Sequence, residues 1–374
     1  MNPKTIRLRT FLRATLTVAA VITSSITWAN PPDGVLDQTH ASVRAVMAVQ
    51  AEVTTELMRW PDVLGTAVGV DDSGTASLLV YVDQDGHGVS DVVRALPTQL
   101  RGIAVKAELT DKFRAFRGKP GGGGGTSHTA IQIPPIQLGT SGGWSKDLAN
   151  GYCCGGTLGS LIQVNGVQYI LSNYHVFESD IVPGGNGIVA TKGDNIIQPG
   201  LIDVGCNASS AKNVATLVKV SSLPGSNVDC SVAEVIPGQV RTDGAILEIG
   251  TISSTTVAAS LNQAVKKSGR TTGLSRSMVS GLNATISITY DNECAGGTAF
   301  TKTFTGQIVI ANQRSSFLNS GDSGSLMVED VTTNPRAVGL LYAGSSTSAI
   351  ANPIGDVLAF LGDKLHGPAS MVGN

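Results

Sequence analysis

A short turn rich in glycine and serine contains the side chain best placed for chemistry. Ser323 lies in a Gly-Asp-Ser-Gly sequence between two apolar, strand-like segments, residues 306–312 and 326–329. Glycine lets the backbone bend there without Cβ clashes, so we expect the serine to be exposed. The N–H groups of Gly321 and Ser323 can then point to one spot and stabilise a developing oxyanion. A serine alone is a weak nucleophile, so an ordinary hairpin turn is the alternative unless the chain also supplies a base.

One histidine has the surroundings expected of that base. His175 follows the apolar, strand-like residues 168–174, whereas the other four histidines lie in polar, glycine-rich or terminal stretches. A lone histidine after an apolar strand is usually structural. His175, however, precedes Ser323 by enough sequence to form a barrel, and acidic residues lie between them. Histidine, acid and serine in that order match chymotrypsin, and differ from subtilisin and the α/β-hydrolases.

Two aspartates compete for the role of the acid. Asp229 lies in the apolar segment 227–235, where a carboxylate can be buried and can accept the Nδ1–H bond of an imidazole. Asp203 follows Pro199-Gly200 and has the pattern of a turn aspartate. The sequence therefore favours Asp229 and keeps Asp203 as its rival.

The segments around the histidine and the serine resemble those of chymotrypsin-like (trypsin-like) serine peptidases. The matching runs are 171–176 and 321–325, and the connecting runs 193–200 and 267–273 resemble a bacterial branch related to the plant Narrow-leaf type. The resemblance covers about residues 129–366. It implies a mainly β fold, a chymotrypsin-like double β-barrel with a C-terminal helix. It also implies hydrolysis of protein or peptide substrates through an acyl-enzyme, with no metal or organic cofactor.

The resemblance also places a specificity pocket, at about residues 316–319 and 341–346. Phe317, Tyr342 and Gly344 are its candidate lining residues, and neither stretch contains an acid. An Arg or Lys side chain would lose its hydration there without gaining a counter-ion, so we expect small or apolar residues before the scissile bond. The alternative is that Phe317 belongs to the core.

The sequence departs from the family pattern in three ways. No cysteine stands directly after His175, Asn173-Tyr174 stand where small residues are common, and no Ile/Val-Val-Gly-Gly activation sequence precedes the body of the chain. The zymogen switch of the digestive enzymes is therefore not expected. Asp322 then needs a partner other than a newly released N-terminus.

The first 29 residues have the pattern of a signal peptide. Basic residues precede the apolar run 14–28, and Thr27-Trp28-Ala29 suits cleavage by a signal peptidase. The run is shorter than a membrane-spanning helix requires, so an uncleaved anchor is the alternative. We expect a secreted or periplasmic protein that has no membrane association after processing.

Residues 30–116 are predicted to form a small α+β domain, joined by a glycine-rich linker, 117–128, to a peptidase domain over 129–374. Asp37 or Thr39 is the predicted N-cap of a helix over 37–60. His87 lies near Asp83 and Asp85, and we interpret this group as a solvated turn rather than a metal site. The remaining predicted elements of this domain are strands over 64–70, 77–82 and 103–109 and a helix over 89–96.

The composition of the body favours many short strands. Glycine accounts for 45 of the 374 residues, and only 14% of residues are charged. The net charge of −2 gives no reason to expect nucleic acid as a partner. Asn165-Gly166 predicts a hairpin turn. An apolar stripe over residues 354–365 predicts a terminal helix, with Asn352 as its N-cap and Pro353 in its first turn. Further strands are predicted over 155–162, 168–171, 214–220, 228–235, 257–265, 277–288, 306–310, 326–329 and 337–342.

Five cysteines follow the signal segment, and their pairing is not readable from sequence. Paired Cys-x-x-Cys motifs and a histidine cluster are lacking, so no metal site is predicted. Two other functions stay open: a peptidase-fold binding module without activity, and a surface interaction protein. The physiological substrate and the oligomeric state are not predicted.

Overall fold

The computed structural model describes residues 34–115, 126–149, 152–178, 189–290 and 300–374. The predicted signal segment, residues 1–29, lies outside the described residues, as does most of the predicted linker, 117–128. The last part of that linker begins a short helix, α4 (Thr126–Thr129).

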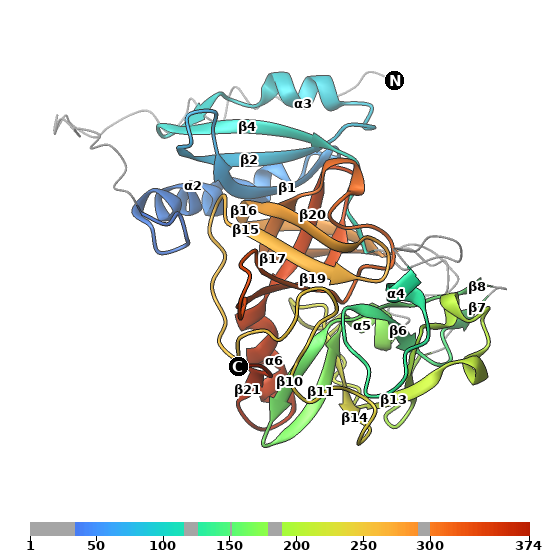
Figure 1. Ribbon diagram of the computed structural model, residues 1–374. Coiled ribbons are helices and arrows are strands. Elements are labelled where there is room, and N and C mark those ends of the chain that lie inside the picture. The colour runs from blue at the N-terminus through green and yellow to red at the C-terminus, as the bar shows by residue number, and fades with distance from the viewer. Residues whose placement is uncertain (1–33, 116–125, 150–151, 179–188, 291–299) are drawn as a thin grey trace.

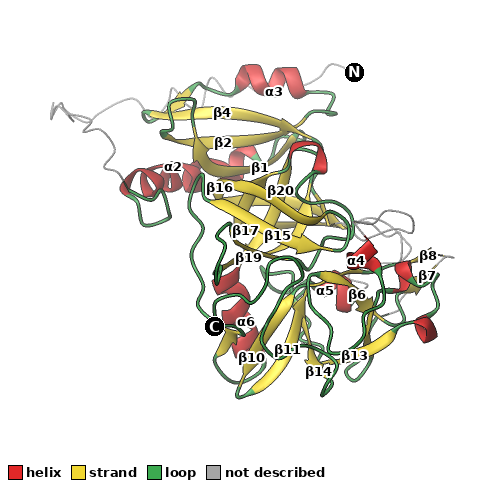
Figure 2. Cartoon of the chain, viewed as in Figure 1, coloured by secondary structure: helices red, strands yellow, loops and turns green. Residues whose placement is uncertain are grey.

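Strands dominate the described part of the chain (Figure 2) and form two large sheets. The larger sheet has eleven strands; ten follow one another in the order β15 (Ala264–Gly269), β18 (Leu326–Glu329), β19 (Ala337–Gly344), β20 (Ser348–Pro353), β17 (Phe300–Ala311), β16 (Gly273–Tyr290), β1 (Val63–Val70), β2 (Ala76–Asp83), β4 (Ile103–Thr110) and β3 (Gln99–Leu100). The eleventh, β5 (Arg114–Ala115), pairs with both β16 and β19. Because β15 also pairs with β16, this part of the sheet curls on itself.

The smaller sheet carries the other half of the body. Its order is β21 (Ala369–Met371), β10 (Ser160–Val164), β11 (Val167–Ser172), β14 (Ser231–Val235), β13 (Lys212–Leu217), β12 (Asn195–Gln198), β6 (Thr140–Trp144) and β9 (Gly156–Leu158). A separate pair consists of β7 (Leu148–Ala149) and β8 (Tyr152–Cys153). The predicted hairpin is confirmed, since β10 pairs with β11 across Asn165 and Gly166, which both have positive φ.

The predicted fold class is confirmed: the protein is mainly β, and its two curled sheets resemble a chymotrypsin-like double β-barrel followed by a C-terminal helix. That helix, α6 (Ile354–Lys364), packs Ile354, Val357 and Leu361 against the core. The predicted cap was wrong. Pro353 occupies the N-cap position, and Asn352 is the preceding residue, whose side chain binds the backbone of Asp229 instead.

Some predicted strands differ from the observed ones at their ends, and some observed strands were not predicted. Residues 257–263 are not a strand, because their backbone bonds, to Leu36, Val279 and Ala337, are isolated and form no ladder; the ladder begins with β15, at Ala264. The strand β20 was missed, since its residues Ser348–Pro353 have weak β propensity and are ordered by pairing with β17 and β19 on both sides. β12 and β21 were also missed.

The N-terminal segment joins the larger sheet directly. Its strand β1 pairs antiparallel with β16, so β1, β2 and β4 extend the sheet of the body (Figure 1). The helix α2 (Ala41–Leu57) packs Val43 and Val46 into a core that also contains residues of β16 and β17. A shorter helix, α3 (Val89–Ala95), lies against β2. Whether residues 30–116 form a domain of their own stays a prediction.

The predicted N-cap of the first helix was wrong. His40 is the N-cap, and its imidazole accepts a hydrogen bond from the N–H of Ser42. The side chain of Asp37 instead accepts hydrogen bonds from Thr39 in the preceding turn. Because the side chain of Asp37 is bonded within the preceding turn, the N-cap position falls to His40.

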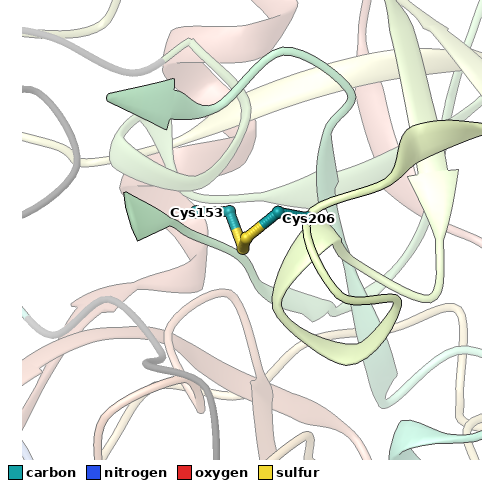
Figure 3. The surroundings of a disulfide bond; sticks show 2 residues. All are labelled: Cys153 and Cys206. Carbon is teal, nitrogen blue, oxygen red and sulfur yellow. A yellow bond between two sulfur atoms is a disulfide. The ribbon is translucent and has the colours of Figure 1, made fainter. Parts of the chain in front are cut away.

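A disulfide joins Cys153, in β8, to Cys206, which follows the short 3₁₀ helix Leu201–Asp203 (Figure 3). Cys230, in the core beside Asp229, is a free thiol, and burial raises its pKa well above the ordinary value. Two further 3₁₀ turns cover Ala208–Ser210 and Gln313–Ser315. Across the described ranges, none of the helices has the length and apolarity to span a membrane.

Candidate active site

His175 is placed by a strand that turns directly into one turn of helix. The strand β11 ends at Ser172, and α5 (Tyr174–Phe177) begins after Asn173, which has extended backbone angles. The side-chain amide of Asn173 donates a hydrogen bond of 2.7 Å to the carbonyl of Asp229. The strand β11 also pairs with β14, which begins shortly after Asp229. This pairing brings the imidazole and the carboxylate together at one end of the smaller sheet.

The structure brings His175 and Asp229 into direct contact. Their Nδ1 and Oδ2 atoms lie 2.6 Å apart, and both side chains are almost completely buried. A carboxylate can only accept, so Nδ1 carries the hydrogen and Nε2 is left with a lone pair. Within the described residues, Nε2 has no hydrogen-bond partner. The arrangement leaves His175 ready to accept a proton at Nε2.

Further donors fix the orientation of the Asp229 carboxylate. Oδ1 accepts the N–H of Tyr174 at 2.7 Å, and Oδ2 accepts the phenol of Tyr290 at 2.9 Å. Burial raises the pKa of Tyr290 well above its ordinary value, and the negative charge of Asp229 adds to this, so the phenol keeps its proton. The backbone N–H of Asp229 donates to the side chain of Asn352 at 3.2 Å. Sequence reasoning missed both Tyr290 and Asn352 as partners of Asp229.

Asp203, the rival acid, has different partners. Its carboxylate accepts two bonds from the guanidinium of Arg270, at 2.9 and 2.6 Å, and one from Ser141 Oγ at 2.6 Å. This ion pair is largely buried. Asp203 therefore ties the loop after β12 to the loop after β15, and it is Asp229 that contacts the histidine.

The turn that carries Ser323 packs against the strand leading to His175. The Ser323 carbonyl accepts the Thr157 N–H of β9 at 2.9 Å, and Thr157 Oγ1 donates to the Gly321 carbonyl at 2.9 Å. Gly324 has a φ of +93°, and a Cβ there would lie 2.2 Å from Ser172 Oγ, at the end of β11. Only glycine fits this position, for reasons of both conformation and space. The turn and the histidine loop are therefore in close contact.

A second close approach relates the two loops. A Cβ added to Gly156 would meet the Val176 side chain at 2.7 Å and the Ser323 carbonyl at 2.9 Å. One backbone position of β9 thus touches both the residue after His175 and the backbone of Ser323. The Ser323 hydroxyl itself donates to the Tyr342 carbonyl at 3.3 Å. Ser323 is buried, so its expected exposure was wrong, because the turn packs against β9 and β19. Gly321, the predicted oxyanion donor, has a φ of +96°, which again suits glycine.

Asp322 has an internal cation as its partner. Its Oδ1 lies 3.2 Å from the Nζ of Lys267, and both side chains are fully buried. Burial lowers the pKa of Lys267, and the attraction of Asp322 opposes that shift. Oδ1 also accepts the N–H groups of Thr271 and Thr272. The sequence required such a partner without identifying it; its signal was a lysine at the start of the run Lys-Ser-Gly-Arg-Thr-Thr, residues 267–272.

The three candidate pocket residues differ in their surroundings. Phe317 is fully buried in the core with residues of β15 and β16, as its alternative interpretation held. Tyr342 is fully buried in an aromatic cluster, with its ring centroid 5.1 Å from that of Phe304. Gly344 ends β19 and pairs with Arg114. That these residues line a pocket stays a prediction.

Among the described residues, no group of three His, Cys, Asp or Glu side chains could hold a metal ion. The hydroxyl, imidazole and carboxylate groups at the candidate site can supply nucleophilic and acid–base chemistry.

Comparisons with known proteins give three results. A family described as the Nal1 C-terminal domain matches residues 211–351, which is less than half of the chain and includes Asp229 and Ser323. No similar sequence is found among curated proteins. Among solved structures, a glutamic acid-specific serine protease covers 63% of this chain and 100% of its own, at 16% identity and a TM-score of 0.40. Thermobifida fusca protease A covers 64% and 99%, at 17% identity and a TM-score of 0.39, and Cellulomonas bogoriensis chymotrypsin gives the same coverage and TM-score at 18% identity.

Proposed function

We propose that the protein is a serine endopeptidase whose catalytic residues are Ser323, His175 and Asp229. The observation that carries the proposal is the buried contact of 2.6 Å between His175 Nδ1 and Asp229 Oδ2. The loop that contains His175 packs against the turn that contains Ser323. A buried carboxylate that sets the tautomer of a histidine, beside a serine on a glycine turn, is the arrangement that acyl transfer needs.

The reaction follows from the atoms available. Ser323 Oγ attacks the peptide carbonyl while His175 Nε2 accepts the hydroxyl proton, and Asp229 stabilises the imidazolium that forms. The N–H groups of Gly321 and Ser323 stabilise the negative oxygen of the tetrahedral intermediate. The imidazolium then gives its proton to the leaving amine. Water hydrolyses the acyl-enzyme by the same steps in reverse order, with His175 again accepting a proton first.

The test is labelling by a fluorophosphonate, which reacts with an activated serine, together with hydrolysis of a peptide panel. Ser323→Ala and His175→Ala are expected to abolish both signals. Ser320→Ala in the same turn and His87→Ala, which is exposed, are the matched controls and should retain them. Asp229→Asn should lower turnover about 10⁴-fold, because the wrong tautomer is then favoured.

Three outcomes would contradict the assignment. Equal hydrolysis by wild type and Ser323→Ala would exclude Ser323 as the nucleophile. A larger loss with Asp203→Asn than with Asp229→Asn would overturn the choice of acid. Peptides ending in Arg, Phe, Leu and Ala test the pocket, because we propose a preference for small or apolar residues; a higher kcat/KM for the Arg peptide would refute it.

The inactive binding module is the alternative function. It predicts a well-folded protein that neither labels nor hydrolyses any peptide. The four donors and acceptors that hold Asp229 and His175 favour the enzyme, because a scaffold without activity has no need for an oriented imidazole at this position.

A further inference from the structure

A short piece of the N-terminal segment is built into the sheet beside the candidate nucleophile. The strand β5, Arg114–Ala115, pairs antiparallel with Ala343 and Gly344 at the end of β19. On its other side it runs parallel to Thr289 and Tyr290 at the end of β16. The backbone N–H of Thr289 also donates to the Phe113 carbonyl at 2.9 Å. Residues 113–115 thus occupy an extended slot between two strands of the body.

That slot adjoins the atoms proposed to react. The carbonyl of Tyr342 accepts the hydroxyl of Ser323, and Ala343, the next residue, pairs with Ala115. Tyr290, at the end of β16 on the other side of the slot, donates its phenol hydrogen to the Asp229 carboxylate. A peptide bound beside the Ser323 hydroxyl must run past the same residues of β19. Its backbone would add as a strand to that edge, since an extended peptide satisfies its own polar groups in this way.

Side chains anchor the segment just before β5. Asp111 accepts hydrogen bonds from both the N–H and the hydroxyl of Ser346, and Thr110 Oγ1 donates to Ser345 Oγ at 2.6 Å. Ser345 and Ser346 follow β19 directly. Phe113 is fully buried in the aromatic cluster that includes Tyr174 and Tyr290, neighbours of His175 and Asp229. Backbone, carboxylate and ring therefore all hold this segment at the site.

We propose that residues 110–115 are a tethered occupant of the peptide-binding edge Ala343–Ser346 and inhibit the peptidase until they are displaced. The edge takes an extended peptide with an acidic residue and, two positions later, an aromatic one. The proposal rests on the proposed function and adds its regulation. Because the occupant belongs to the same chain, its effective concentration is high, and a free substrate competes poorly with it.

Asp111→Ala is the variant that tests the proposal, because it removes a partly buried anchor outside the hydrophobic core. Asp71→Ala is its matched control: Asp71 likewise accepts the N–H and hydroxyl of a serine, Ser73, but within the N-terminal segment itself. We expect Asp111→Ala to raise kcat/KM on peptides roughly tenfold, since it removes bonds to a charged acceptor. Asp71→Ala should leave kcat/KM unchanged.

Two measurements that need no catalysis accompany the kinetics. Hydrogen exchange at residues 343–346 should be faster in Asp111→Ala than in Asp71→Ala. A fluorescent peptide of residues 110–115, Thr-Asp-Lys-Phe-Arg-Ala, should bind about tenfold more tightly to Ser323→Ala/Asp111→Ala than to Ser323→Ala alone.

The outcomes separate the two proposals. One outcome is faster exchange and tighter peptide binding, while neither wild type nor Asp111→Ala is labelled by the fluorophosphonate. It would refute the peptidase and support the peptide-binding edge. Normal labelling with unchanged peptide binding in Asp111→Ala would overturn the tethered occupant and keep the peptidase. Faster exchange with an unchanged kcat/KM would show that the segment does not inhibit, and would also overturn the proposal.

Discussion

Replacing Lys267 with methionine removes the ammonium group that faces Asp322 in the core beneath the serine turn. Both side chains are fully buried, and their Nζ and Oδ1 atoms lie 3.2 Å apart. Methionine has a similar length and volume, so the substitution removes the charge and leaves little cavity. Asp322 then stays in the core as a carboxylate without a counter-ion.

The expected cost follows from what remains around Asp322. Removing one partner of a buried ion pair costs about 3–5 kcal/mol of unfolding free energy. Four donors still reach the carboxylate, from Thr271, Thr272 and Asn319. We therefore expect the low end, about 3 kcal/mol. The turn should also shift, and a displacement of the nucleophile by about 1 Å lowers turnover roughly a hundredfold.

Urea unfolding of both proteins measures the loss. Lys266→Met is the matched control, because Lys266 is the adjacent buried lysine of β15 and, among the described residues, donates to the Val331 carbonyl rather than to a carboxylate. Losing that hydrogen bond should cost about 1.5 kcal/mol. The cost of Lys267→Met should persist at high salt, since buried pairs are screened little. The reasoning fails if Lys267→Met costs no more than Lys266→Met, or if salt removes the difference.

Two further predictions concern the acid and export. Tyr290→Phe removes the phenol that donates to Asp229 Oδ2, and kcat/KM should fall about tenfold. Because burial raises the pKa of Tyr290 well above its ordinary value, the phenol donates at neutral pH and at pH 9 alike, so the loss should be equal at both; a loss confined to neutral pH would contradict this. For export, N-terminal sequencing of secreted or periplasmic protein should find a chain that starts near Asn30 or Pro31, whereas intact Met1 in a membrane fraction would indicate an anchor.

Local patterns were sufficient for the elements whose signals lie in neighbouring residues. Strand β18 was predicted with its observed bounds, and the Asn165-Gly166 turn was predicted because a two-residue hairpin needs positive φ at both positions. The terminal helix was predicted from its apolar stripe. Its cap was not, because Asn352 has two competing roles, and the long-range bond to Asp229 excludes the local one.

Partners distant in the sequence were beyond such reasoning. Tyr290 and Lys267 look like ordinary residues of β16 and β15, and only the folded sheets bring them to Asp229 and Asp322. The missed strand β20 has weak intrinsic preference for its conformation and is ordered by its two neighbours. The energy of such pairing depends on strands that are distant in the sequence, so it cannot be estimated from the residues of one short segment.

The sequence by itself determined the chemical groups: a serine on a glycine turn, one histidine after an apolar strand, and an aspartate in a buried segment between them. The order of these residues and the glycines are local properties, readable along the chain. Only the tertiary structure decided which aspartate contacts the histidine, which cation neutralises Asp322, and what lies against β19. Those depend on contacts across tens to hundreds of residues, such as the pairing of Ala115 with Ala343, which form because closing the sheets buries apolar surface.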